Sequence, residues 1–478
     1  MDQVYRELRI GLAGLGLEAY WAQFEGLKDR LLGYLRVVQE KIEGQHRCVI
    51  NMGMIDSPEK AIDAGHSCRQ RDIDILLVYV TTYALSSTVL PIILRAKVPV
   101  ILLNLQPGAA IDYEGFNRMT SRTAMTGEWL AYCSACPVPE IANVLRRLDI
   151  PFEQVTGMLE NDSGCWTELE GWLTAAGVAK TLSHSRMGLM GHYYSGMLDI
   201  ATDLAQVSGR LGTHVEIVEV DQLSELRREV SLRETAAKRL QFQRFFAIDE
   251  KCARKELDRA ATTAVALDKL VAKFSLDMLA YYYMGSGIKE NEDTMSSIIL
   301  GTSMLTGSGT PVAGEYEVKN VLAMKIMDEL GAGGSFTEYY AMDYDADLVL
   351  MGHDGPGHTR IAQDKIRVRP LQVFHGKVGR GLSVEMAVKH GPVTLLSVVE
   401  DKNKGFSFLV AEGESVPGPI LEIGNTNSRY RFSLGARGFV EAWNARGPAH
   451  HCAVGVGSWG MELRKIAALM DLGFTQIC

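Results

Sequence analysis

Five side chains in the second half of the chain are of the types that bind divalent metal ions: Glu315, Glu338, His353, His450 and His451. Carboxylate oxygens and imidazole nitrogens together form a mixed ligand set that suits Mn²⁺ before zinc and leaves positions open for water or substrate. Any one of these residues alone is more often a salt-bridged or capping group, and the adjacent histidines also fit a surface dipeptide. The pattern therefore raises a metal site as one hypothesis and separate structural roles as the other.

The sequence predicts a structural element for each glutamate. Glu315 follows the loop 307–311 and precedes a segment, 318–330, whose apolar residues are spaced for one helix face, so we expect it at or before a helix N-terminus. The glycines of 331–334 are typical of a helix C-cap. Glu338 follows in a stretch rich in aromatic residues and Thr, which indicates a strand. A Glu in a largely apolar strand is costly unless it is paired or binds a metal.

The histidines follow or precede apolar segments. Asp347–Met351 predicts a short strand, which places His353 just past its carboxyl end, where open α/β sheets bind their ligands. His450 and His451 lie far downstream, immediately before another apolar stretch. A metal site requires these distant segments to converge in the fold.

Apolar segments of strand length alternate with helical segments in the first half of the chain. Arg9–Leu15, Asp74–Val80 and Pro99–Leu105 are near-continuous apolar runs, as a parallel sheet covered on both faces requires. A second α/β region begins near Ser185, where we expect strands at Met187–Met190 and His214–Val220 and a helix at about 197–209.

The sequence pattern changes from about Gly379, where short apolar segments are separated by Gly, Asp, Asn and Lys. This spacing predicts antiparallel strands in a small barrel or sandwich. We therefore predict an α/β protein with two doubly wound parallel-sheet domains and a C-terminal antiparallel β-barrel-like domain. The expected boundaries are 1–180, 181–350 (with the metal-ligand carboxylates) and 351–478 (contributing the His ligands).

Composition and charge exclude several function classes. There are 49 basic and 58 acidic side chains, for a formal net charge of −9, which argues against a nucleic-acid partner. No stretch approaches the uncharged apolar length of a membrane span, and the first residues do not follow a signal-peptide pattern. We expect a cytoplasmic protein with neither a nucleic acid nor a membrane as partner.

Two short motifs carry little functional weight. Gly11, Gly14 and Gly16 follow a G-x-x-G-x-G order, which is not that of a dinucleotide-binding fold. Cys133 and Cys136 form a single CxxC with no second pair for a structural zinc site. Two incidental thiols are the favoured interpretation, with redox activity as the alternative.

Four blocks of sequence together resemble the L-arabinose isomerase branch of the L-fucose/L-arabinose isomerase family. They are GEYEVK (314–319), GGSFTEYYAMDY (333–344), LVLMGH (348–353) and AHH (449–451), in matching order and spacing. The segments LLNLQP (102–107) and RMGLMGHYYSGMLD (186–199) also look like that family. The likeness is loose but extends over nearly the whole chain.

The resemblance implies two α/β domains followed by a β-rich barrel, and a Mn²⁺-dependent aldose–ketose isomerase. Co²⁺ or Mg²⁺ are alternative ions. The metal ligands would be Glu315, Glu338, His353 and one histidine of the pair, with His451 favoured over His450. The two glutamates would also transfer protons. The family further implies a homo-oligomer, hexameric or built from trimers.

The substrate expected from these features is a free sugar, bound partly by residues that follow predicted strands. The contacts proposed for it are His450, His192, Gln106, Tyr20 and Trp21. Two segments depart from the arabinose-specific pattern, at 17–21 and at 354–358, so the sequence favours a sugar other than L-arabinose. The alternatives are a non-catalytic sugar-binding or regulatory protein on the same scaffold and a metal-dependent sugar epimerase.

Overall fold

A computed structural model describes residues 7–371, 380–401 and 405–478 of the chain. The chain divides into two compact units, with the boundary between Lys180 and Thr181. We call them the N-terminal unit and the C-terminal unit and describe each by itself. The first residues of the expected 1–180 domain and the onset of the expected β-rich pattern at Gly379 lie outside the described residues.

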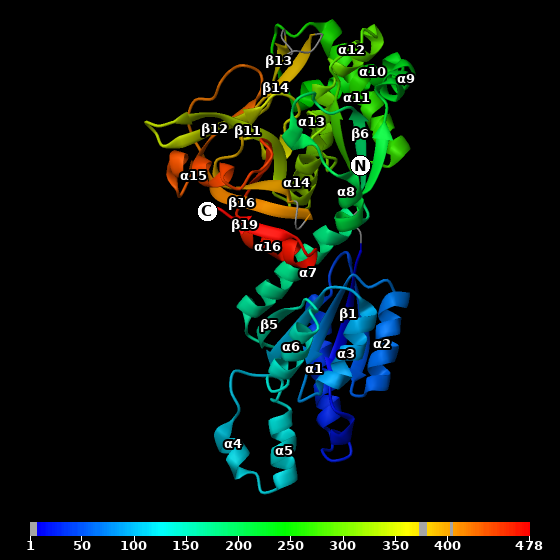
Figure 1. Cartoon of the computed structure of the whole chain (residues 1–478), viewed down its shortest axis with the longest axis vertical. Helices are drawn as coiled ribbons and strands as arrows, with labels where there is room; N and C mark the ends of the chain where they lie inside the picture. Colours follow the sequence, from blue (N-terminus) through cyan, green and yellow to red (C-terminus); the bar gives the residue numbers. More distant parts are fainter. Residues whose placement is uncertain (1–6, 372–379, 402–404) are drawn as a thin grey trace. The chain divides into compact units, whose positions relative to one another are not determined.

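The N-terminal unit contains one parallel five-stranded sheet in the order β2-β1-β3-β4-β5, drawn in blue and cyan in Figure 1. This order is typical of doubly wound sheets, in which ligand sites lie at the carboxyl ends of the strands. The strands are β1 (Leu8–Leu15), β2 (Arg47–Ile55), β3 (Ile75–Val80), β4 (Val100–Gln106) and β5 (Glu153–Met158). The helices are α1 (Leu27–Ile42), α2 (Pro58–Gln70), α3 (Ser86–Ala96), α4 (Tyr113–Arg118), α5 (Arg122–Leu130), α6 (Val138–Arg147) and α7 (Ser163–Ser183), with the 3₁₀ turn η1 (Glu18–Tyr20).

Apolar side chains bury both faces of this sheet. Strand β3 is buried at every position, as its uninterrupted apolar sequence predicts. Helices α2, α3 and α6 share one core cluster with the sheet. The apolar face of α1 is also buried, at Leu27, Leu31, Leu35 and Val38.

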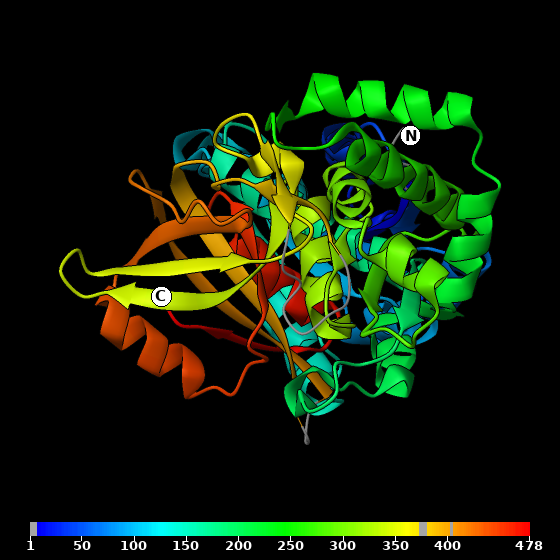
Figure 2. The same ribbon diagram turned by 90° about the horizontal axis from the view of Figure 1, so that it is seen from above.

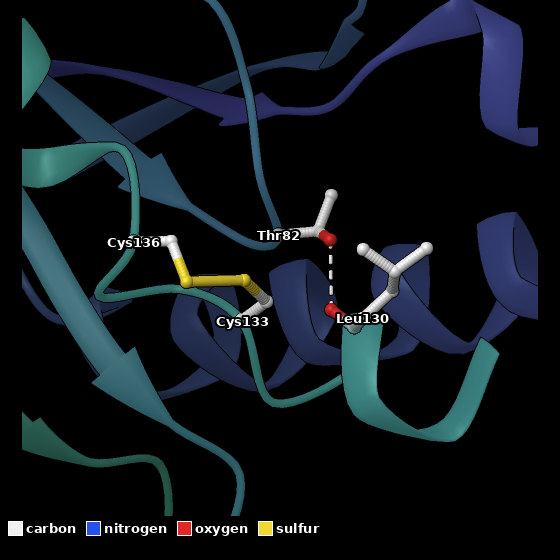
Figure 3. The surroundings of a disulfide bond; sticks show 4 residues. All are labelled: Thr82, Leu130, Cys133 and Cys136. Carbon is white, nitrogen blue, oxygen red and sulfur yellow. Dashed lines mark hydrogen bonds between the residues drawn. A yellow bond between two sulfur atoms is a disulfide. The ribbon is translucent and has the colours of Figure 1, made fainter. Parts of the chain in front are cut away.

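Cys133 and Cys136 are joined by a disulfide bond, so the expectation of two incidental thiols is wrong. Both lie in the turn between α5 and α6, which brings their Cα atoms to 5.7 Å, a separation that a disulfide can bridge. Next to the turn, the Thr82 hydroxyl donates a hydrogen bond of 2.7 Å to the Leu130 carbonyl (Figure 3). The disulfide and this hydrogen bond fix the path of the chain between the two helices.

The C-terminal unit contains a second parallel sheet in the order β10-β9-β6-β7. Its strands are β6 (Arg186–Gly191), β7 (His214–Val218), β9 (Met278–Tyr282) and β10 (Val312–Ala313). Its helices are α8 (Leu204–Leu211), α9 (Val220–Arg228), α10 (Leu232–Phe245), α11 (Arg254–Phe274), α12 (Lys289–Met295), α13 (Ile299–Gly307) and α14 (Val318–Glu329). A small separate sheet, β14-β13-β8, comprises β8 (Ala247–Ile248), β13 (Arg367–Leu371) and β14 (Gly381–Glu385).

Two expected elements differ from the structure in this region. The predicted helix at 197–209 is instead a 3₁₀ turn, η2 (Leu198–Ile200), followed by α8, because the Asp203 carboxylate caps α8 by accepting from the backbone N–H of Ala205. The predicted strand His214–Val220 ends at Val218, since Glu219 is the N-cap residue of α9.

The rest of the C-terminal unit is an antiparallel barrel, yellow to red in Figure 2. Its sheet order is β15-β18-β11-β12-β17-β16-β19, and the additional pairing of β15 with β16 closes six of the seven strands into a ring. The seven strands are β11 (Gly333–Asp343), β12 (Leu348–His353), β15 (Gly391–Asp401), β16 (Gly405–Val416), β17 (Thr426–Phe432), β18 (Cys452–Val456) and β19 (Gly473–Gln476), of which β19 lies outside the ring. The remaining elements are η3 (Thr359–Ile361), α15 (Gly435–Asn444) and α16 (Gly460–Leu469).

The architecture confirms the predicted fold class: α/β with two parallel sheets flanked by helices, followed by an antiparallel barrel. The barrel begins at β11, so Glu338 lies in it. The expectation that His353 follows a strand of an open parallel sheet is wrong, because His353 ends β12, which pairs antiparallel with β11 and β17. Among the helices of the described residues, none combines the length and apolar content needed to cross a bilayer.

Candidate metal centre

All five metal-binding candidates lie together in the C-terminal unit. His451 Nε2 lies 3.5 Å from Glu315 Oε2, and His353 Nε2 lies 3.8 Å from Glu315 Oε1. Two groups have ligand atoms close enough to share an ion: Glu315 with His450 and His451, and Glu338 with His353 and His451. His451 belongs to both groups, so it is the centre of the cluster.

An unusual turn presents Glu315 to this cluster. Glu315 and the next residue, Tyr316, both adopt left-handed backbone conformations, with φ of 57° and 63°. Two consecutive non-glycine residues in this region store strain, which is common at functional sites. The turn connects β10 to α14 and is held by a 3.0 Å hydrogen bond from the Tyr316 backbone N–H to the Tyr281 carbonyl on β9.

Three neighbouring barrel strands place the other ligands. On β11, Glu338 pairs with Gly352 of β12, next to His353, and Thr337 pairs with Cys452 of β18, next to His451. Phe336 precedes Glu338 by two positions, so both side chains lie on the same face of β11. The buried Phe336 ring packs against the rings of His353 and His451, at centroid distances of 4.3 and 4.4 Å.

Burial keeps two of the histidines neutral. Burial, with help from a neighbouring histidine, lowers the pKa of His353 and of His451 to about 3. A neutral imidazole is the form that binds a metal. His353 also donates from Nδ1 to the Asp354 carbonyl, which directs its Nε2 atom toward Glu315.

His450 has a different environment. Its Nδ1 atom and its backbone N–H both donate to Asp199 Oδ2, at 2.6 and 3.0 Å. Its Nε2 atom lies 3.7 Å from Glu315 Oε2 and 4.0 Å from Glu338 Oε2. Burial alone would lower the pKa of His450, but its interactions with Glu315 and Asp199 raise the pKa to about 9.

The structure adds two residues that the sequence reasoning missed, Glu317 and Lys319. Glu317 is fully buried, and its Oε2 atom lies 3.5 Å from His451 Nδ1. Burial raises the pKa of Glu317 to about 7. Lys319 Nζ lies 3.6 Å from Glu317 and donates to the carbonyl oxygen of Asp199 at 2.8 Å. The E-x-E-x-K spacing after Gly314 was the available signal in the sequence.

The residues present fit a divalent cation. Within the described part of the chain, the buried atoms Glu315 Oε2 and His451 Nε2 have no hydrogen-bond partner. A buried polar atom without a partner costs about 1–3 kcal/mol. A cation between the carboxylate and the imidazole would remove this cost, and the oxygen and nitrogen donors suit Mn²⁺ or a similar ion.

A cavity of about 600 Å³ opens onto this cluster. Glu315, Glu338 and His353 line one part of it. Its volume is within the range of small-molecule binding sites. The cluster is therefore accessible to a ligand.

Of the predicted substrate contacts, His450 belongs to the cluster, whereas His192, Gln106, Tyr20 and Trp21 are not among the described residues that line the cavity. His192 is exposed, its Nδ1 bonds to the Tyr193 carbonyl, and its ring packs edge-on against Tyr282. Tyr194, in the same segment, lines the cavity instead.

Tyr20, Trp21 and Gln106 belong to the N-terminal unit, at the carboxyl edge of its sheet. The indole N–H of Trp21 donates to Asp56 at 2.8 Å, and the Gln106 amide donates to the Gly108 carbonyl. Tyr20 packs edge-on against Phe24. These contacts give the three residues local structural roles in that unit.

Comparison with known proteins assigns no family to this chain. No protein-family model matches it, and no curated protein matches it at a significant level.

Proposed function

We propose that this chain is a metal-dependent aldose–ketose isomerase that acts on a sugar through an ene-diol intermediate. The observation that carries the proposal is that Glu315, Glu338 and His353 line an accessible cavity and belong to two possible metal-binding groups that share His451. This agrees with the resemblance of the four sequence blocks to the L-fucose/L-arabinose isomerase family. We further propose that the protein is cytoplasmic, from its composition, and a homo-oligomer, from the family resemblance.

Glu315, Glu338, His353 and His451 would hold the cation, with Mn²⁺ as the proposed ion. When bound, it would act as a Lewis acid toward the two substrate oxygens at C1 and C2. Phe336 keeps the two imidazoles in place by packing against both rings. Glu317, next to His451 Nδ1, fixes the orientation of that ligand.

The two carboxylates supply the proton transfers. Isomerisation moves one proton between C1 and C2 and another between O1 and O2. One glutamate takes the proton from C2 of the aldose, exchanges it with solvent, and then protonates C1, while the other moves the hydroxyl proton from O2 to O1. His450 Nε2 faces both carboxylates and, held by Asp199, is positioned to hydrogen-bond to either of them or to a substrate hydroxyl.

The test is incubation of the Mn²⁺-loaded protein with a panel of aldoses in D₂O, followed by NMR. We expect a ketose that carries deuterium at C1. The Glu338→Gln variant is expected to lose about 100-fold or more in rate, the usual contribution of a general acid or base. Glu441→Gln, an exposed glutamate on α15, is the matched control and is expected to keep full activity.

Each other outcome identifies a different function. An epimerised aldose without ketose would indicate a sugar epimerase. Sugar binding that chelators do not change, with no turnover, would indicate a binding or regulatory protein. Full isomerase activity of Glu338→Gln would contradict the proposal.

A further inference from the structure

The cavity next to the metal cluster has a lining of charged and apolar side chains. Among the described residues that line it, the charged ones are Glu315, Glu338, His353 and Asp354, which follows His353 directly. Most of the other described lining residues are aliphatic or aromatic, among them Ile298, Ile299, Leu350, Leu421 and Ile423. We call the part of the cavity beside Ala341 and Leu350 its distal part.

The strand register shows how far the apolar part extends. Glu338 pairs with Gly352, and Ala341 pairs with Leu350 in the same ladder. The partners Gly352 and Leu350 are two residues apart, so at a rise of about 3.4 Å per residue Ala341 lies roughly 7 Å along the ladder from Glu338. A register shift between Tyr339 and Ala341 marks a β-bulge, which explains why four consecutive residues, 338–341, line the cavity.

In the distal part, the Tyr339 hydroxyl has no hydrogen-bond partner among the described residues and could serve one substrate hydroxyl, but few other polar groups are available to a sugar. The Asn425 amide lines the cavity, but its nitrogen donates to the Tyr340 hydroxyl at 2.8 Å and its oxygen accepts from Asn427 at 2.9 Å. Hydroxyl groups placed against aliphatic side chains would lose their hydrogen bonds to water without replacement, which is unfavourable. Aromatic rings alone could stack on a sugar, but the isoleucines and leucines cannot replace its hydrogen bonds.

We infer that the substrate carries an apolar group, of the size of an aromatic ring or a short alkyl chain, at the end opposite its reacting carbonyl. The inference rests on the proposed function, because the metal cluster defines which end of the cavity receives C1 and C2. The hydroxyl-bearing end lies against the carboxylates and imidazoles, and the apolar group lies between α13 and the bulged part of β11.

The test compares arabinitol with its 5-O-benzyl ether as ligands of the Mn²⁺-loaded full-length protein, by isothermal titration calorimetry. We expect the benzyl ether to bind about 10- to 100-fold more tightly, from the burial of its ring. Ala341→Trp fills the distal part of the cavity and should abolish this preference. Ala346→Trp, in the exposed hairpin turn after β11, is the control and should preserve it.

Three results would overturn the inference: equal affinity for the two polyols, binding of neither, or a preference that Ala341→Trp leaves intact. A change of oligomeric mass in Ala341→Trp, measured by light scattering, would also overturn the inference. The apolar side chains around Ala341 would then form a contact between copies of the chain and not a substrate site. Failure of the proposed function is distinguished by its own readouts, which are the absence of Mn²⁺ binding and the absence of ketose from every aldose tested.

Discussion

Asp199 holds His450 by two hydrogen bonds to the same carboxylate oxygen, from the backbone N–H at 3.0 Å and from the imidazole Nδ1 at 2.6 Å. Asp199 lies in η2, between β6 and β7 of the parallel sheet in the C-terminal unit, whereas His450 lies just before the barrel strand β18. The buried ammonium of Lys319 donates to the carbonyl oxygen of Asp199 and so fixes the segment. The contact therefore connects the two halves of the C-terminal unit at the candidate site.

Replacing Asp199 tests whether it positions His450 for turnover. We expect Asp199→Asn to lower kcat about 10-fold, since groups that orient an active-site histidine typically contribute about 10- to 100-fold. The Kd for Mn²⁺ should change much less than kcat, because the ligands are other residues. Asp203→Asn, which retains an N-cap residue for α8, is the control. A purely structural role would lower the melting temperature and leave kcat of the folded fraction unchanged.

Glu317 is expected to control the affinity of the site for its ion. Its carboxylate lies 3.5 Å from His451 Nδ1, on the side of the ring opposite the cluster. Glu317→Gln removes the negative charge behind this ligand and should weaken Mn²⁺ binding by about 10- to 100-fold. Titration calorimetry on this variant and on Glu441→Gln measures the effect. An unchanged Kd in Glu317→Gln would exclude this role.

Acid should destabilise the N-terminal unit through Asp56. Burial alone would raise the pKa of Asp56, but hydrogen bonds from Lys60 and Trp21 and the charge of Lys28 lower it below its usual value of 3.8. A lowered folded-state pKa means that the stabilisation is present above pH 3.8 and is lost as the pH falls below it. At neutral pH, Asp56→Asn should cost about 1–2 kcal/mol of unfolding free energy.

Urea unfolding at pH 6 and pH 3 measures this effect. The difference between the wild-type protein and Asp56→Asn should shrink at pH 3. An equal difference at both pH values would show that the carboxylate charge does not contribute.

Reduction of the Cys133–Cys136 disulfide should have a small and local effect. The bond closes a very short loop, with a sequence separation of 3, and loop-closure entropy then gives about 2 kcal/mol at most. We expect the Cys133→Ser/Cys136→Ser variant to lose no more than this in the N-terminal unit. Its Mn²⁺ affinity should equal that of the wild-type protein, and a changed Kd would contradict a local role.

The sequence predicted the fold class because its apolar patterns are strong. Uninterrupted runs such as 75–80 can only be buried on both faces, and they form the parallel sheet. The context of His353 could not be predicted in the same way, since a short apolar strand does not reveal whether its neighbours are parallel. The start of the helix predicted at 197–209 depended on one capping contact of Asp203, which places it at Leu204.

The ligand types at the candidate site were visible in the sequence, but the groups behind them were not. Glu315, Glu338, His353 and His451 are of recognisable metal-binding types, and the fold brings them together. The role of Asp199 depends on a hydrogen bond across 251 residues of sequence, and no local pattern encodes such a contact. The apolar lining of the cavity likewise combines residues from separate helices, strands and loops.

The most direct test of the account is a crystal structure of the Mn²⁺-soaked protein with anomalous difference density measured for manganese. We predict one strong peak within about 2.0–2.4 Å of donor atoms from Glu315, Glu338, His353 and His451. No peak at this cluster, or a peak held by other residues, would contradict the central claim that these four side chains share one cation.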